Sequence, residues 1–122
     1  MMDSDQEFDK QLPLTPAAFN ILLALVDGEK HGYAILRTVT EQTDGAVKLL
    51  PGTLYNLLKR MLEQGWIEEL DERPDPAVDD ERRRYSRLSA LGEKLASLEA
   101  ERLAQQVRAA RKRGLLFGRE ET

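Results

Sequence analysis

Residues 51–65 read PGTLYNLLKRMLEQG and residues 66–88 read WIEELDERPDPAVDDERRRYSRL, and together these two segments decide the fold. In the first segment apolar side chains recur at spacings of three and four, which predicts a helix from about Pro51 to Gly65. The second segment holds two stretches that favour extended structure, at about 66–71 and 83–88. The loop between them is too long for a two-residue turn. A helix followed by a long-looped β-hairpin is therefore predicted.

Two further helices are predicted before this unit. Thr15-Pro16 is a strong helix start, with threonine as N-cap and proline at the first helical position, and Asp27-Gly28 is a stop. The apolar residues of this first helix go almost all the way round, so we expect it to be buried on more than one side. A second helix is expected at about Tyr33–Thr43. Residues 47–50 are expected to form a short strand, because Pro51 disfavours helix at the residue before it.

The chain is expected to end in one long helix, which Ser89 caps and which runs from Ala90 to about Arg113. The predicted order is then helix, helix, short strand, helix, strand, long loop, strand and long helix. Three helices followed by a hairpin indicate a mainly α fold: a winged helix-turn-helix with a two-stranded β wing and a long C-terminal helix.

These elements divide the chain into four parts. Residues 1–13 are expected to be a flexible acidic tail, because they lack hydrophobic periodicity. Residues 14–88 are expected to form the winged-helix domain, residues 89–113 the long C-terminal helix, and residues 114–122 a second tail.

Composition excludes several classes of function. The 122 residues include no cysteine and one histidine, so neither a Cys-ligated metal nor a paired-His site can be assembled. No nucleophile–base pair or phosphate loop of catalytic spacing is present, and we therefore expect no enzyme, cofactor or metal. The longest apolar run, Ala17 to Val26, is too short to span a bilayer, and no signal peptide precedes it. The expected location is the cytoplasm.

The net charge of −4 taken alone argues against a nucleic-acid partner. The charges are uneven, however: residues 1–30 sum to −4 and residues 101–122 to +3. Three consecutive arginines at 82–84 directly follow three acids at 79–81. Arginine suits bidentate phosphate contacts, so the position of these side chains matters more than the sum.

In a helix-turn-helix the second helix of the motif enters the major groove, and here that helix begins near Thr53. Its core stripe leaves four side chains outward that can contact bases or phosphates. The free N–H groups at its start form a natural phosphate site, and a wing places arginine near the minor groove or backbone. The predicted DNA contacts are Gly52, Thr53, Tyr55, Asn56, Lys59, Arg60, Arg82, Arg83 and Arg84.

Several motifs resemble those of the PadR family of bacterial transcriptional regulators. They are His31-Gly32-Tyr33, then Gly52-Thr53-Leu54-Tyr55, then Arg83-Arg84-Tyr85 with Leu88-Ser89 and Gly92. The resemblance covers roughly residues 14–100. It implies a winged helix-turn-helix that dimerises through its first and last helices, and it adds Tyr33 as a phosphate contact. The single terminal helix resembles the short PadR subfamily.

The resemblance implies a homodimeric repressor that binds double-stranded DNA at a palindromic operator. The residues expected at the dimer interface are Phe19, Leu22, Leu23, Leu91, Leu95, Leu98, Leu103 and Val107. The operator, the target genes and a small-molecule effector are not specified by the sequence. A different class of function is a winged-helix protein-interaction module without DNA reading, which the acidic surplus favours.

This sequence departs from the family pattern at three places. Asn56 stands where the family often has proline, and Ser86 stands where a second aromatic usually follows the tyrosine. The last helix has no aromatic residue between Ala90 and Arg113, so stacking of flat drugs in the dimer interface is not expected. His31 and Trp66 are interpreted as structural residues, one before a helix and one in the core.

Overall fold

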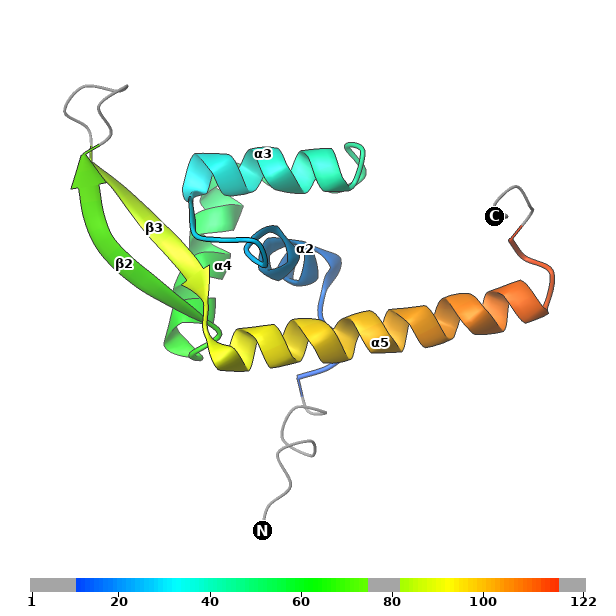
Figure 1. The fold of residues 1–122 in the computed structure, drawn as a ribbon. Helices are drawn as coiled ribbons and strands as arrows, with labels where there is room; N and C mark the ends of the chain where they lie inside the picture. Colours follow the sequence, from blue (N-terminus) through cyan, green and yellow to red (C-terminus); the bar gives the residue numbers. More distant parts are fainter. Residues whose placement is uncertain (1–10, 75–81, 117–122) are drawn as a thin grey trace, which may run out of the picture.

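A computed structural model describes residues 11–74 and 82–116, and it gives side chains for residues 11–70 and 84–116. The elements follow one another in the order α2, β1, α3, α4, β2, β3 and α5 (Figure 1). Their bounds are α2 Pro16–Ala24, β1 Lys30–His31, α3 Gly32–Gln42, α4 Pro51–Glu63, β2 Ile67–Pro74, β3 Arg82–Leu88 and α5 Ala90–Lys112. The predicted order of three helices, a hairpin and a long helix is confirmed.

Helix α2 is the centre of the core. It lies between α3 and the first half of α5, and is seen nearly end-on in Figure 1. Apolar side chains from α2, α3, α4 and α5 meet there without contact with solvent: Ile21, Leu22, Ile35, Val39, Leu54 and Leu95. The nearly uniform apolar surface of α2 in the sequence is thus explained largely by burial within its own chain. Trp66 also joins this core, as expected.

The described sheet has three strands, one more than the two-stranded wing that was expected. Strand β3 lies in the middle and pairs antiparallel with both β1 and β2. The partners of β1 are Ser86 and Tyr85, which face Lys30 and His31. The prediction of a strand at 47–50 is wrong. Leu50 does have the extended backbone that Pro51 requires, but residues 47–50 pair with no strand of the described sheet, whose order is β1-β3-β2.

Three helices begin with a side-chain cap. Thr15 accepts a hydrogen bond from the Ala18 N–H at 3.1 Å, and the Ser89 hydroxyl accepts one from the Gly92 N–H at 3.0 Å. The cap of α3 is His31, whose Nδ1 accepts from the Ala34 N–H at 3.3 Å. His31 also packs edge-on against Tyr85. These contacts support the interpretation of His31 as a structural residue, since its ring orders the start of α3.

The junction between α4, β2 and α5 is tightly bonded. Gly65 has a φ of +81°, the left-handed conformation that commonly ends a helix. The Trp66 N–H then donates to the Met61 carbonyl at 2.8 Å. From α5, the Ser89 N–H donates to the Trp66 carbonyl at 3.1 Å and the Ser89 hydroxyl donates to the Gly65 carbonyl at 2.6 Å. The base of the wing and the start of the last helix are thus fixed to each other.

The folded part begins before the expected boundary at residue 14. Leu12 packs against the core and Leu14 is buried within it, so the tail predicted for residues 1–13 is shorter than that. Residues 1–10, most of the expected second tail and the acidic cluster at 79–81 lie outside the described residues.

The residues expected at the dimer interface divide into three groups by burial. Leu22 and Leu95 have no exposed surface because they fill the chain's own core, so their assignment to the interface is wrong. Phe19, Leu91 and Leu98 are half-buried, whereas Leu23, Leu103 and Val107 are exposed. The second half of α5 extends beyond the other helices (Figure 1).

In the described ranges no helix is both long and apolar enough to cross a membrane.

Candidate nucleic-acid interface

The outward face of α4 is centred on Asn56. Because a helix turns about 100° per residue, the buried side chains Leu54 and Met61 place Asn56 on the opposite face, and its side chain is exposed. Lys59 lies on one side of Asn56, where it lines a cavity. Arg60 lies on the other side, where it lines a small cavity near Thr15 and Trp66. The outward face of α4 therefore presents the amide of Asn56 between two cationic side chains, Lys59 on one side of the helix and Arg60 on the other.

The start of α4 differs from the starts of α2, α3 and α5. Its N-cap residue is Leu50, whose side chain makes no capping hydrogen bond. Pro51 has no N–H, so the N–H groups of Gly52 and Thr53 are the first free donors of the helix. Both residues are exposed. An uncapped, exposed helix start is a favourable place for a phosphate.

Tyr33 and Tyr55 extend this surface onto the start of α3. Tyr33 is 62% exposed and Tyr55 57%. The Tyr55 ring lies across the backbone of Gly32, where an added Cβ would come within 2.8 Å of its hydroxyl oxygen. A side chain at position 32 would therefore displace Tyr55. Gly32 and Tyr55, which come from two of the quoted motifs, are therefore in direct contact.

Arg37 belongs to the same surface and was not predicted. Its guanidinium carbon lies 5.7 Å from the centre of the Tyr33 ring, one turn earlier on α3. This is cation–π distance. The i,i+4 spacing of Tyr33 and Arg37 is visible in the sequence, but only the exposure of this side of α3 identifies it as a cationic neighbour of α4.

The wing contributes one described arginine of the predicted three. Arg84 donates from Nη1 to Oε2 of Glu69 at 3.2 Å, across the β2–β3 pair. Arg87 donates in the same way to Glu68 at 3.0 Å. The wing therefore carries its positive charge next to carboxylates. The backbones of Arg82 and Arg83 lie in β3, but their side chains are outside the described part of the chain.

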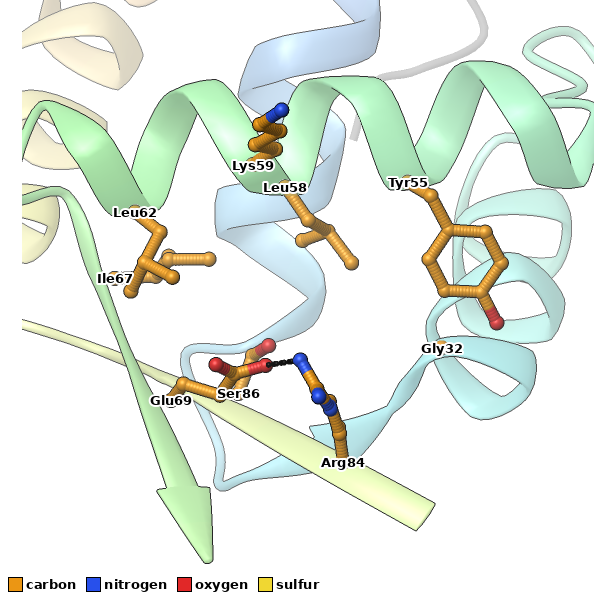
Figure 2. Close-up of a pocket in the computed structure, with 9 residues that line it drawn as sticks. All are labelled: Gly32, Tyr55, Leu58, Lys59, Leu62, Ile67, Glu69, Arg84 and Ser86. Atoms are coloured by element: carbon orange, nitrogen blue, oxygen red, sulfur yellow. Dashed lines mark hydrogen bonds and ion pairs between the residues drawn. The ribbon is translucent and has the colours of Figure 1, made fainter. Parts of the chain in front are cut away.

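A cavity separates α4 from the sheet (Figure 2). Its volume is about 360 Å³. Tyr55 and Lys59 of the predicted interface line it together with Arg84, so these three residues surround one space. Figure 2 shows Leu58 pointing into the cavity and the Lys59 side chain directed away from the strands. The remaining lining residues are Gly32, Leu58, Leu62, Ile67, Glu69 and Ser86.

A three-helix unit with an exposed second motif helix and an attached β wing defines the class of winged helix-turn-helix proteins. The chain belongs to the PadR-like family of transcriptional regulators, whose model matches residues 21–98. The resemblance found in the sequence motifs is therefore confirmed. No curated protein matches the sequence.

Solved structures share this fold. A transcriptional regulator from Clostridium thermocellum is 22% identical with a TM-score of 0.65, over 92% of this chain and 97% of that one. A Streptococcus transcriptional regulator is 27% identical with a TM-score of 0.62, over 82% and 97%. Bacillus subtilis PadR, solved in complex with operator DNA, is 20% identical with a TM-score of 0.60. That match covers 70% of this chain and 46% of the Bacillus protein.

Proposed function

We propose that this protein is a sequence-specific DNA-binding repressor in which α4 enters the major groove. The observation that carries the proposal is the face of α4: an uncapped helix start followed by exposed Asn56, with Lys59 and Arg60 on either side. Asn can pair bidentately with adenine, and Lys or Arg with guanine. The operator complex of the related Bacillus protein supports the same use of the fold.

Phosphate contacts then come from the surroundings of α4. The N–H groups of Gly52 and Thr53 bind one phosphate, and the hydroxyls of Tyr33 and Tyr55 reach the backbone beside it. The arginines at 82–84 follow the backbone or minor groove next to the wing. The overall negative charge makes non-specific affinity weak, so base contacts provide most of the selection. Such a protein acts in the cytoplasm, on the nucleoid.

We test this with DNA selected from a random pool, followed by anisotropy titrations of the selected duplex at several salt concentrations. Asn56→Ala is expected to weaken binding by about tenfold or more and to relax preference at one base position, because a bidentate pair is worth roughly 1–3 kcal/mol. Lys59→Ala is expected to weaken binding by a similar factor. Lys112→Ala removes the same charge at the far end of α5 and is the matched control.

Three outcomes contradict the proposal. If no sequence is enriched, or if binding does not weaken with salt, α4 does not read DNA. Capture of a protein partner in that case supports an interaction module. Equal losses in Lys59→Ala and Lys112→Ala would mean that only overall charge matters, and not the face of α4.

The working form is proposed to be a homodimer joined through α5. The helix face that packs on the domain through Leu95 and Ala96 continues, at helical spacing, into Leu103 and Val107. These two side chains are 37% and 45% exposed because no other element of the described chain covers them. A second copy covers this stripe and holds two α4 helices about 34 Å apart, which fits a palindrome with half-sites one turn apart.

The double variant Leu103→Glu with Val107→Glu is expected to be monomeric in sedimentation equilibrium and to bind the selected duplex at least about tenfold more weakly. Gln105→Glu adds a negative charge on the opposite face of α5 and keeps an acceptor for Arg108, whose Nη2 lies 2.7 Å from the Gln105 Oε1. It is expected to stay dimeric. A wild-type monomer, or a dimer that survives the double change, would rule out this interface.

A further inference from the structure

The cavity between α4 and the sheet has the size and lining of a small-molecule site. Its volume of about 360 Å³ falls in the range of roughly 300–1,000 Å³ typical of such sites. Leu58 and Leu62 of α4 line one side, and Ile67 of β2 lies beside Leu62 (Figure 2). The Tyr55 ring stands at one end. The result is an apolar slot with an aromatic side, which suits a flat or compact apolar molecule.

Ser86 gives the slot a polar group without a partner. It lies in the central strand β3, is 8% exposed and lines the cavity. Among the described residues its hydroxyl makes no hydrogen bond, although buried hydroxyls normally do. The strand pairing uses only its backbone. The Ser86 hydroxyl can therefore form a hydrogen bond with a ligand atom that donates or accepts.

The charges around the slot favour a neutral ligand. Arg84 and Glu69 stand on the same side of the sheet with Nη1 and Oε2 3.2 Å apart, so their charges cancel at the edge of the cavity. Lys59 also lines the cavity, but its side chain is directed away from the strands in Figure 2. An ionised ligand would lose its hydration there without gaining a counter-charge of its own.

We propose that this cavity binds a small neutral organic molecule with one apolar ring system and one hydroxyl or carbonyl group, and that the bound molecule weakens DNA binding by α4. The polar group bonds to Ser86 and the ring packs between Leu58, Ile67 and Tyr55. The effect on DNA rests on the proposed function, because Tyr55 belongs to both surfaces. A ligand that holds the Tyr55 ring removes its hydroxyl from the phosphate contact, and DNA must weaken ligand binding by the same factor.

The binding step is tested without DNA, by calorimetric titration of the full chain with 2-naphthol. Naphthalene, which lacks the hydroxyl, and 2-naphthoate, which is ionised at pH 7, are the matched probes. One 2-naphthol per chain is expected, with 2-naphthoate at least about tenfold weaker. Ser86→Ala is expected to weaken 2-naphthol by about fivefold and leave naphthalene unchanged, because only the first can use the hydroxyl. Ser97→Ala, on the exposed side of α5, is the control.

Leu58→Phe is expected to fill the slot and abolish binding of both neutral probes, with thermal melting used to check that the variant folds. If it does not fold, the Ser86→Ala comparison between the two probes decides. Absence of saturable 2-naphthol binding overturns the proposal, and so does binding that ignores both substitutions.

The regulatory step is tested by repeating the DNA titration with 2-naphthol at saturation. About a tenfold loss of affinity in the wild type, absent in Leu58→Phe, supports it. Binding of 2-naphthol with unchanged DNA affinity overturns the coupling to DNA. If the wild type binds no DNA at all, the proposed function fails, while the calorimetric result still decides whether the cavity is a ligand site.

Discussion

Gly92→Ala is expected to lower the free energy of unfolding by about 3 kcal/mol or more. A Cβ added at this position in the first turn of α5 would overlap the carbonyl oxygen of Trp66. That oxygen is backbone and is already held by the Ser89 N–H at 3.1 Å, so it cannot move aside without breaking the junction between the wing and α5. Since a domain of this size is stable by only about 5–15 kcal/mol, the variant should melt well below the wild type.

The measurement is urea denaturation followed by circular dichroism, with Gly52→Ala as control. Gly52 also lies in the first turn of a helix, but an added Cβ there meets nothing within 4 Å. Alanine at that position is expected to be neutral or to stabilise by about 0.5 kcal/mol, because it restricts the unfolded chain. Equal stability of the two variants would mean that α5 does not rest on the Trp66 backbone.

Local patterns in the sequence were sufficient for the helices. The start of α2 at Thr15-Pro16, the spacing of apolar residues in α4 and the cap of α5 at Ser89 all depend on neighbours within four residues. Such signals can be recognised without knowing the tertiary structure.

Contacts between distant segments could not be predicted in the same way. Strand β1 has two residues, too few for an alternating pattern, and it exists only because β3 offers a free edge. The placement of Leu22 and Leu95 at a dimer interface failed for a related reason. Apolar periodicity tells which side of a helix is buried, but not whether the same chain or a second copy covers it.

The candidate site was predicted as a set of exposed residues and found as a surface with a cavity beside it. The pattern of α4 gave the outward position of Asn56 and Lys59. The pattern could not predict the cavity next to Tyr55, because that space depends on the separation of α4 from the sheet. It also depends on a small residue, Ser86, which lies more than twenty positions after the end of α4. Arg37 was missed because its role depends on the exposure of α3 next to α4.

Glu99→Gln is expected to remove a pH dependence of stability that the wild type shows in acid. Glu99 lies on α5, and its side chain is 2% exposed. Arg102 donates to both carboxylate oxygens, from Nε at 2.9 Å and from Nη2 at 2.7 Å. This bidentate bond, with a further one from the Leu14 N–H, holds the pKa of Glu99 below its usual value of 4.5 despite the cost of burial.

The sign of the effect follows from this lowered pKa. A carboxyl group with a lower pKa in the folded state stabilises the fold fully above its unfolded-state pKa, near 4.5. The contribution is lost as the pH falls through the lower folded-state value. Unfolding free energies measured in urea should therefore decrease more steeply below pH 4.5 for the wild type than for Glu99→Gln. Glu101→Gln, which changes an exposed carboxylate on the same helix, should keep the wild-type profile.

At pH 7 the variants separate the two roles of Glu99. Glu99→Gln keeps an oxygen that can accept from the Leu14 N–H and should cost about 1–2 kcal/mol for the lost charged hydrogen bonds. Glu99→Ala also leaves that N–H without its partner and opens space in the core, so about 2–4 kcal/mol is expected. The Leu14 N–H precedes the Thr15 cap by one residue, and Glu99→Ala should therefore expose the N-terminal segment to proteolysis. Equal costs for the two variants would mean that Glu99 acts only through Arg102 and does not hold the start of α2.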